Sequence, residues 1–202
     1  MTHAIDAVVF DLGGVVLDWD PAHLYRQVID DPAELDHFLA VVCTREWHLQ
    51  HDAGRPMAET IPELCERHPD HAGLIPLWRE RYVDMVAGHV RGTVALLDEL
   101  AHRVRLLALT NMPAEVVDEL REAFPALERF EGMVVSGVER IMKPAPEIFE
   151  LLASRHDLEP SRTLFVDDVE ENVAGARACG FHATRFRSAE ELRGDLRAYG
   201  VL

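Results

Sequence analysis

Short apolar runs that alternate with helical patterns are the feature that most restricts the fold of this chain. The runs are rich in valine and leucine, and uninterrupted apolar stretches of this length suit strands covered on both faces. They lie at Ala7–Phe10, Val104–Leu109, Met133–Val135, Leu164–Val166 and, more weakly, His182–Phe186. Strands that alternate with helices pair in parallel through right-handed crossovers. We therefore predict an α/β protein with an open, doubly wound parallel sheet.

The helical patterns that separate these runs carry ordinary start and stop signals. Proline opens two of them and Gly180 follows another, as expected at the two ends of a helix. The predicted helices are Thr93–His102, Pro113–Ala123, Pro146–Arg155, Glu170–Cys179 and Ala189–Tyr199. The last of these is expected to cover the sheet.

A long segment interrupts the alternation directly after the first run. It has no convincing strand pattern, and its helical patterns lie at Pro21–Ile29, Pro32–Cys43, Met57–Arg67 and Ala72–Val86. A connection from a strand to a helix usually takes about 2 to 6 residues, so a connection of about 70 residues indicates an inserted subdomain. We predict a core formed by residues 1–17 and 90–202 and a helical cap formed by residues 18–89. Gly13-Gly14 before the cap and Gly88 and Gly92 after it are plausible hinges.

Composition argues against several classes of protein. The 202 residues include 20 Lys+Arg and 36 Asp+Glu, for a formal net charge of −16. Nucleic acids and anionic membranes are bound by basic surfaces, so neither partner is expected. Hydrophobic residues make up 48% of the chain, as in a folded globular protein. No apolar run approaches the roughly 20 residues of a membrane span, and no signal peptide is evident, so we expect a cytoplasmic location.

The cysteines and the lysine are informative by their number. Cys43, Cys65 and Cys179 have neither metal-site nor CxxC spacing, and we expect them to be core thiols in a reducing compartment. Lys143 is the only lysine, and the other 19 Lys+Arg residues are all arginine. A compact ammonium and a planar guanidinium are not interchangeable in a tight site. Position 143 is therefore expected to require an ammonium group.

Polar residues follow four of the predicted strands where each strand ends. Ligands bind outside the carboxyl ends of the strands in an open parallel sheet. One such residue alone could cap a helix or begin a turn, but their convergence on one edge indicates a site. The residues are Asp11, Thr110 with Asn111, Ser136 with Lys143 seven positions later, and Asp167 with Asp168.

This set of groups is suited to phosphoryl transfer. Two adjacent aspartates joined by a third would repel strongly unless a cation neutralised them or one stayed protonated. A carboxylate-lined, all-oxygen site suits a hard ion such as Mg²⁺. A metal ion, a lysine and small polar donors neutralise the charge on a transferring phosphoryl group. Asp11 would then attack phosphorus in line and form an acyl phosphate.

These residues occur in ordered motifs that resemble the haloacid dehalogenase superfamily, a family of mostly Mg²⁺-dependent phosphatases. The motifs are Phe10-Asp11-Leu12-Gly13-Gly14-Val15, Leu109-Thr110-Asn111, Lys143-Pro144 and Phe165-Val166-Asp167-Asp168, with Glu171 and Asn172 following. The resemblance covers the whole chain. It implies a Rossmann-like core with an inserted cap and the hydrolysis of a small phosphorylated metabolite. The segment Glu46–Gly54 is similar to the cap loop of sugar-phosphatase-like members, which favours a sugar phosphate.

The resemblance implies that Mg²⁺ is held by three groups of this chain. Asp11 would be both the nucleophile and a metal ligand, and Asp168 would be the second carboxylate ligand. The backbone carbonyl of Gly13 would be the third ligand from the protein.

The resemblance also implies how the phosphoryl group is held. Thr110 and Asn111 would bind the phosphoryl oxygens, and Lys143 would pair with both Asp11 and the phosphate. Asp167 and Asn172 would act nearby or through water.

The chain departs from the family pattern at Gly13. Phosphatases of this family normally have an aspartate there, which protonates the leaving alkoxide and later activates water. Glycine offers a carbonyl but no proton, and positioned acid–base catalysis is worth about 10² to 10⁴ in rate. Candidate substitutes are Asp18, Asp20, His48 and His51. Asp18 and Asp20 also fit a helix cap before Pro21.

Two other functions are compatible with the glycine. A 2-haloacid dehalogenase expels halide, which leaves without a proton, but dehalogenases of the family lack the Asp167-Asp168 pair and need no Mg²⁺. A protein that only binds a phosphate ligand would tolerate Gly13, but it would not require Asp11, Lys143 and both aspartates. The sequence does not determine the oligomeric state, because apolar cap surface can be either core or interface.

Overall fold

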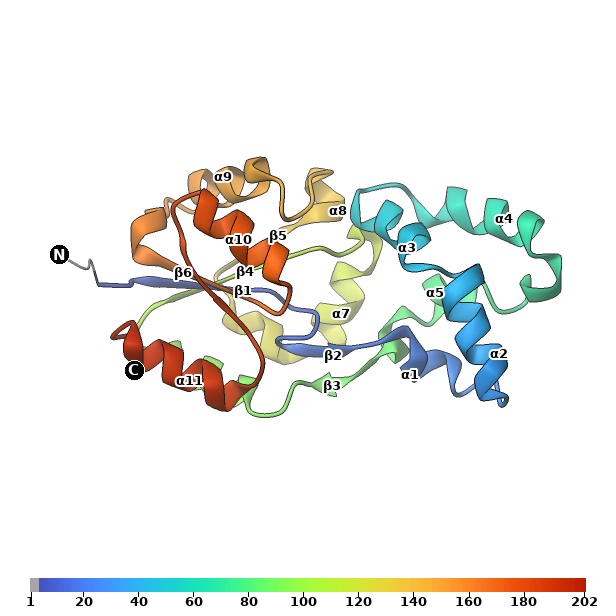
Figure 1. Ribbon diagram of the computed structural model, residues 1–202, viewed down its shortest axis with the longest axis horizontal. Coiled ribbons are helices and arrows are strands. Elements are labelled where there is room, and N and C mark those ends of the chain that lie inside the picture. The colour runs from blue at the N-terminus through green and yellow to red at the C-terminus, as the bar shows by residue number, and fades with distance from the viewer. Residues whose placement is uncertain (1–3) are drawn as a thin grey trace.

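The computed structural model describes residues 4–202 and shows a parallel sheet between helices, with an inserted segment at one end (Figure 1). The sheet order is β5-β4-β1-β6-β7, and every neighbouring pair is parallel. The strands are β1 (Ala7–Phe10), β4 (Arg105–Thr110), β5 (Gly132–Val135), β6 (Thr163–Asp167) and β7 (His182–Arg185). The predicted doubly wound α/β fold is confirmed.

The helices of this part of the chain lie close to their predicted ranges, except for the short helix Ser136–Glu139, which was not predicted. A 3₁₀ turn at Ala114–Val116 replaces the start of the predicted helix Pro113–Ala123. Within residues 4–202, no helix combines the length and apolar character that crossing a membrane requires. The helices are α6 (Thr93–Leu100), α7 (Val117–Ala123), α8 (Ser136–Glu139), α9 (Pro146–Arg155), α10 (Glu170–Ala178) and α11 (Ala189–Ala198).

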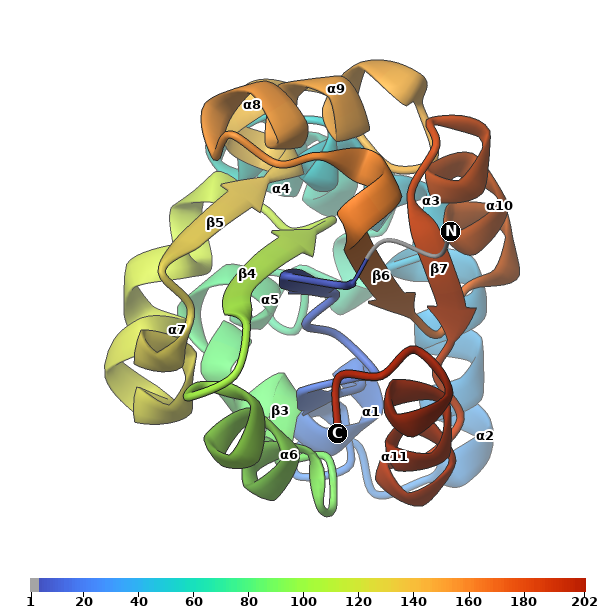
Figure 2. The same ribbon diagram turned by 90° about the vertical axis from the view of Figure 1, so that its left-hand side faces the viewer.

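Strand side chains alternate between two apolar clusters on opposite faces of the sheet. Helices α9 and α10 cover one face, and α6 and α11 cover the other (Figure 2). Val9 of β1 belongs to the cluster under α9, where Phe149 packs edge-on against Phe165 with 5.5 Å between ring centroids. Val8 and Phe10 belong to the other cluster. The two clusters bury β1 and β6 completely, which fixes the positions of their ends.

The inserted segment is joined to the core by two short strands that sequence analysis missed. β2 (Leu17–Trp19) and β3 (Val86–His89) form an antiparallel pair, with Trp19 opposite Val86. The expectation of no strand between residues 18 and 89 is therefore wrong at both edges of the segment. Each strand has three or four residues and a partner about 70 positions away, so periodicity along the chain carries no signal for it.

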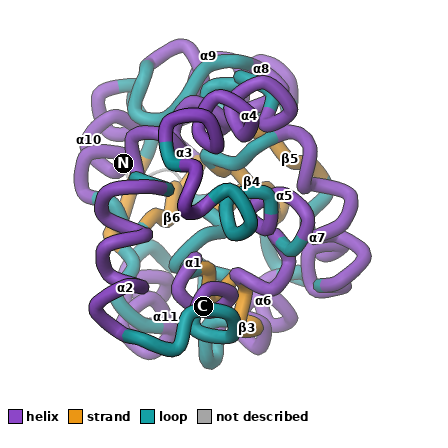
Figure 3. Tube along the Cα trace, turned by 90° about the vertical axis from the view of Figure 1, so that its right-hand side faces the viewer, coloured by secondary structure: helices purple, strands orange, loops and turns teal. Residues whose placement is uncertain are grey.

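The rest of the inserted segment is helical (Figure 3). The predicted helix Ala72–Val86 is wrong, because Pro76 has no N–H to continue it. Short turns at Pro69–His71 and Tyr82–Met85 flank a single short helix in its place. A π-helical stretch, Phe38–Val42, follows α2. The helices are α1 (Pro21–Tyr25), α2 (Pro32–His37), α3 (Arg45–Asp52), α4 (Met57–Arg67) and α5 (Leu77–Glu80).

Helix α3 occupies the segment that resembled a cap loop. The Thr44 hydroxyl caps its first turn by accepting a hydrogen bond from the Trp47 N–H at 3.1 Å. Its buried face carries Trp47, His48, His51 and Asp52. Histidine and aspartate on the buried face hid the amphipathic pattern by which a helix is normally predicted.

The cysteines only partly follow the prediction of core thiols. Cys43 is buried, whereas Cys65 and Cys179 are half-buried. All three are free thiols. The prediction is confirmed for Cys43 alone.

The start of α1 provides a test of the capping alternative for Asp20. The Asp20 carboxylate accepts a hydrogen bond from the Ala22 N–H at 2.8 Å, whereas the more exposed Asp18 lies 3.4 Å from His23. Asp20→Ala is expected to lower the free energy of unfolding by about 1 kcal/mol. Asp18→Ala should lower it by less than about 0.5 kcal/mol. Urea unfolding followed by circular dichroism measures both, and equal losses would contradict the capping role.

Candidate active site

The structure brings the predicted site residues together at the carboxyl ends of three neighbouring strands. Asp11 follows β1, Thr110 ends β4, and Asp167 ends β6 with Asp168 next to it. The Asp11 N–H donates to the Val166 carbonyl at 2.8 Å, so the pairing of β1 with β6 continues up to the carboxylate. One oxygen from each of the three aspartates lies within 4.8 Å of the others. The sheet order thus produces the carboxylate cluster predicted from the sequence.

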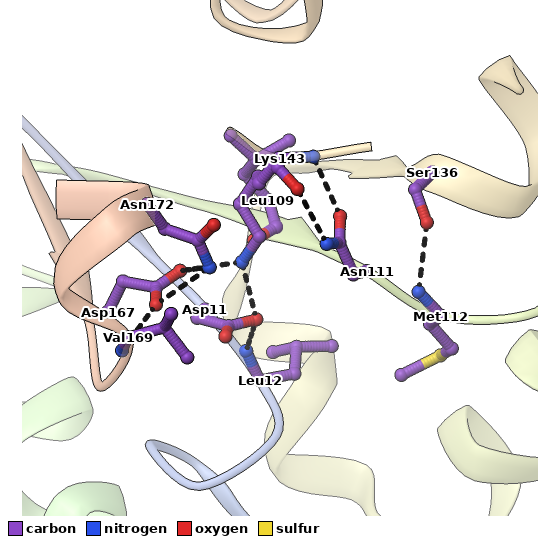
Figure 4. Close-up of polar contacts among 10 residues, drawn as sticks. All are labelled: Asp11, Leu12, Leu109, Asn111, Met112, Ser136, Lys143, Asp167, Val169 and Asn172. Carbon is purple, nitrogen blue, oxygen red and sulfur yellow. Dashed lines mark hydrogen bonds and ion pairs between the residues drawn. The ribbon is translucent and has the colours of Figure 1, made fainter. Parts of the chain in front are cut away.

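Lys143 is buried at the centre of this cluster (Figure 4). Its Nζ lies 2.9 Å from Asp11 Oδ1 and 2.7 Å from Asp167 Oδ2. The third contact of Nζ is a hydrogen bond of 2.9 Å to the Leu109 carbonyl oxygen. An ammonium has three donors, and all three are used here. A planar guanidinium could not replace this compact group, which accounts for the one lysine of the chain.

Asn111 positions the lysine by holding its backbone. The Asn111 Nδ2 donates to the Lys143 carbonyl at 3.1 Å, and its Oδ1 accepts from the Lys143 N–H at 2.9 Å. The side chain is therefore committed to the segment that carries the lysine. The predicted contact of Thr110 and Asn111 with phosphoryl oxygens stays a prediction.

Asp167 is a fully bonded partner of the lysine. Its carboxylate accepts hydrogen bonds from the Asn172 Nδ2 at 3.0 and 3.1 Å and from the Val169 N–H at 2.9 Å, in addition to the lysine. Asp11 Oδ1 accepts from Lys143 and from the Leu12 N–H at 2.7 Å. None of these hydrogen bonds involves Asp11 Oδ2 or the Asp168 carboxylate. These are the oxygen atoms best placed to meet a cation.

The two glycines after Asp11 serve different purposes. Gly14 has a positive φ of 71°, and a Cβ there would come within 2.6 Å of Asp168 Oδ2. Glycine at position 14 therefore makes room for the third carboxylate. A Cβ at Gly13 would meet nothing within 4 Å, so packing does not require glycine at position 13.

Burial sets the charge state of the cluster. It raises the pKa of Asp11 to about 7, with Lys143 opposing the shift and Asp167 and Asp168 adding to it. Burial also raises the pKa of Asp168, helped by the charge of Asp167. Burial lowers the pKa of Lys143, but the two carboxylates outweigh it and the net shift is upward. Three carboxylates beside one ammonium remain short of positive charge, and an all-oxygen set of this kind fits a divalent ion such as Mg²⁺.

A cavity of about 880 Å³ lies between this cluster and the inserted segment. Asp11, Thr110, Lys143 and Asp168 line its core side. The helices of the inserted segment supply the opposite wall. The cavity is therefore the place where a ligand would meet both parts of the chain.

The four residues predicted as possible substitutes for the proton donor missing at Gly13 differ in whether they line the cavity. Asp18 and Asp20 make the contacts described above and do not line the cavity. His51 Nε2 lies 2.6 Å from Thr60 Oγ1, and His51 is also absent from the cavity wall. His48 lines the wall together with Asp52, which sequence analysis did not single out. The signal that could have identified Asp52 is an acidic residue on the buried face of a helix.

His48 and Asp52 form a buried contact one helical turn apart. His48 Nε2 lies 3.6 Å from Asp52 Oδ1, and the His48 ring stacks on Trp19 with 5.0 Å between centroids. Burial, with His51 and Arg45, lowers the pKa of His48 to about 3. Burial raises the pKa of Asp52 to about 7, against the opposing charges of Lys143 and Arg45. The imidazole is therefore neutral near pH 7, and the carboxyl titrates there.

Comparison with known proteins gives evidence on the family of this chain that is independent of the site geometry. A family model described as haloacid dehalogenase-like hydrolase matches residues 5–180. The sesquiterpene phosphatase astK of Aspergillus oryzae is 27% identical over 185 residues, which is 89% of this chain and 89% of that protein. The fructose-1-phosphate phosphatase YqaB of Escherichia coli is 24% identical over 188 residues, covering 89% of this chain and 95% of that protein.

A solved structure shows the same fold. The magnesium complex of a HAD-family enzyme from Bacteroides thetaiotaomicron matches with a TM-score of 0.75 and 20% sequence identity. The match covers 96% of this chain and 100% of that one. The core and the inserted segment are both included in a match of this extent.

The raised pKa of Asp52 predicts how stability depends on pH. The carboxyl ionises near pH 4 in the unfolded chain and near pH 7 in the folded one, so the unfolded chain releases its proton first. The free energy of unfolding therefore falls as pH rises between these values. Asp52→Asn removes this loss, and its stability relative to the wild type should rise from pH 4 to pH 7 by at most about 4 kcal/mol.

Denaturant unfolding of both proteins at several pH values measures the difference. Asp11 titrates in both proteins, so the difference isolates Asp52. A difference that does not change with pH would contradict the raised pKa of Asp52.

Proposed function

Because the chain belongs to the haloacid dehalogenase-like hydrolases, we propose that it is a Mg²⁺-dependent phosphatase that hydrolyses a phosphate monoester through an aspartyl phosphate on Asp11. The observation that carries the proposal is the buried Lys143 ammonium between Asp11 and Asp167, with Asp168 beside them. The group combines a carboxylate nucleophile, a fixed positive charge and a second carboxylate for a cation. Phosphoryl transfer needs these three elements in one place.

Mg²⁺ would be held by Asp11, Asp168 and the backbone carbonyl of Gly13. When bound, it supplies positive charge against the equatorial phosphoryl oxygens. The raised pKa values of Asp11 and Asp168 support this assignment, because a nearby cation would return both groups to the ionised state.

The other residues position the reacting groups. Lys143 favours the ionised form of Asp11 and would hold it in a fixed orientation for in-line attack on phosphorus. Asp167, itself fixed by Asn172, holds the lysine. Thr110 would bind the phosphoryl oxygens through its hydroxyl and Asn111 through its backbone N–H, because the Asn111 side chain is committed to the backbone of Lys143.

Residues 18–89 act as a cap over the core formed by residues 1–17 and 90–202. The cap excludes water from the cavity and contacts the organic part of the substrate. Its present contacts with the core include Arg79 with Glu119 at 2.7 Å and the Met57 N–H with the Glu115 carboxylate at 3.3 Å. The turn at Gly13-Gly14 and the segment around Gly88 and Gly92 serve as hinges.

The two other functions considered above fit the site less well. Dehalogenation gains nothing from three buried carboxylates, which are costly without a cation. A protein that only binds phosphate does not need a nucleophile held by a buried ammonium. Hydrolysis of a phosphate ester uses every group of the cluster.

The cavity walls favour an ester with a largely apolar organic group. Away from the carboxylates, the wall includes five partly exposed apolar side chains, which are Trp19, Pro21, Leu39, Leu49 and Met142. The polar side chains that α3 contributes are Arg45, His48 and Asp52. A sugar phosphate has a hydroxyl on most of its carbon atoms and would leave many of them without partners in this wall. One relative is a sesquiterpene phosphatase and another is a fructose-1-phosphate phosphatase, and the wall composition favours a substrate of the former kind.

The reaction is tested by metal removal and by the nucleophile variant. Hydrolysis of p-nitrophenyl phosphate should be lost in EDTA and restored by Mg²⁺. Asp11→Asn should lower the rate at least about 10³-fold, because the proposed covalent intermediate forms on this carboxylate. Colorimetric assay of p-nitrophenol measures both effects. Activity that persists in EDTA or in Asp11→Asn would contradict the proposal.

The substrate class is tested by comparing two esters under the same conditions. The kcat/KM for geranyl phosphate should exceed that for fructose 1-phosphate by at least about tenfold, because apolar burial is worth about 0.8 kcal/mol per CH₂. Leu39→Asn should lower kcat/KM for geranyl phosphate and leave fructose 1-phosphate nearly unchanged. Phosphate release measures all four values. A preference for the sugar phosphate would overturn the apolar assignment and leave the reaction class intact.

A further inference from the structure

The site lacks a proton donor beside the nucleophile, although the leaving group of an alkyl phosphate requires one. Gly13 has no side chain, and Lys143 donates all its hydrogen bonds to Asp11, Asp167 and Leu109. Among the substitutes predicted from the sequence, Asp18, Asp20 and His51 have other partners and lie off the cavity wall. The donor must therefore come from the cavity wall itself.

Asp52 is held on that wall by a connection to the phosphate-binding edge of the sheet. The Ser136 hydroxyl donates to the Asp52 carbonyl at 2.7 Å and accepts from the Met112 N–H at 3.0 Å. Met112 lies two residues after Thr110, at the end of β4. This chain of hydrogen bonds fixes the last turn of α3 against the loop that would hold the phosphoryl group.

The side chain of Asp52 lies in the cavity without a hydrogen-bond partner for Oδ1. It is 4% exposed, and within residues 4–202 no donor or acceptor satisfies this buried oxygen. His48 Nε2 lies 3.6 Å from this oxygen, which is too far for a hydrogen bond. An unsatisfied buried carboxyl oxygen is costly, and its retention at a cavity indicates a ligand as its partner.

Resting on the phosphatase function proposed above, we propose that Asp52 is the catalytic acid and base that replaces the missing aspartate at position 13. In the first step an Asp11 carboxylate oxygen attacks phosphorus, and the bond from phosphorus to the ester oxygen breaks. Asp52 gives its proton to that oxygen, so the alcohol leaves and Asp52 becomes a carboxylate. In the second step water attacks phosphorus and gives a proton to Asp52, while the bond from phosphorus to Asp11 breaks. Inorganic phosphate leaves, Asp11 regains its electron pair, and both residues return to their first state.

The surroundings of Asp52 suit both halves of this cycle. The charged and titratable groups around it are Arg45 and His48 of α3, Tyr82 of the turn after α5, and Lys143 of the core. Burial is the largest influence and raises the pKa of Asp52 to about 7, so the protonated and ionised forms are both populated near neutral pH. A group with a pKa near the working pH is the most effective acid–base catalyst. The pKa of His48 is lowered to about 3, so His48 does not take the proton from the Asp52 carboxyl near neutral pH.

The test uses single-turnover kinetics with two esters that differ in their need for a proton. The nitrophenolate of p-nitrophenyl phosphate leaves unprotonated, whereas the alkoxide of hexyl phosphate does not. Asp52→Asn should slow transfer from hexyl phosphate by about 10² to 10⁴ and leave the first nitrophenolate burst nearly unchanged. The aspartyl phosphate should then accumulate, because the second step has lost its base. Asp18→Asn is the matched control and should change neither ester.

A rescue variant separates a catalytic role from a structural one. Because a Cβ at Gly13 meets nothing within 4 Å, Gly13→Asp fits the turn and restores a carboxyl beside Asp11. The double variant Gly13→Asp with Asp52→Asn should regain most of the rate on hexyl phosphate. A disrupted cavity would not be repaired by a carboxyl placed on the core. Asp52→Ala provides a second variant if the asparagine does not fold.

Three results would overturn the inference. They are equal losses on both esters, an unchanged rate on hexyl phosphate, and failure of Gly13→Asp to rescue. Failure of the phosphatase function itself would be seen earlier, as absence of Mg²⁺-dependent turnover of either ester by the wild type. The two failures are therefore distinguishable.

Discussion

The ammonium of Lys143 is the interaction on which the rest of this site depends. Asp11 and Asp167 end two adjacent strands, so the sheet forces their largely buried carboxylates together with the half-buried Asp168 at the wall of the cavity. Without the lysine, the cost of burying these charges would have to be relieved by protonation, and a protonated Asp11 is no nucleophile. Two carboxylates and a backbone carbonyl hold Nζ in place. Asn111 fixes the backbone that carries the lysine.

In the proposed reaction this arrangement divides the chemistry between the two parts of the chain. The core would bind charge, because its strand ends carry the carboxylates, the ammonium and the proposed metal ligands. The inserted segment contributes apolar walls and Asp52, and hydrogen bonds through Ser136 connect its α3 helix to the core. In the family pattern that the sequence resembles, the acid–base carboxyl would lie beside the nucleophile on the core. In this chain proton transfer from Asp52 would require the inserted segment to be closed over the core, so turnover would depend on that closure.

The core was predictable from the sequence, and the cap wall was not. Apolar runs identify β1 and β6, and the parallel topology then brings Asp11 and Asp168 together whatever the details of the connections. The lone lysine identified a position that needs an ammonium. Asp52 was not predicted as a site residue because His48, His51 and Asp52 give the sequence of α3 the polarity of a loop. Their burial depends on the folded cavity and cannot be seen in the sequence. The strands β2 and β3 were not predicted because each is short and its pairing partner is distant in the chain.

Trapping the covalent intermediate is the most direct measurement of the central claim. The protein is mixed with p-nitrophenyl phosphate and Mg²⁺, quenched in acid within one turnover, digested and examined by peptide mass spectrometry. The account predicts a phosphorylated peptide with the phosphoryl group on Asp11. The peptide should be absent in EDTA and in Asp11→Asn, and it should be more abundant in Asp52→Asn. Turnover without this peptide, or a phosphoryl group on another residue, would contradict the account.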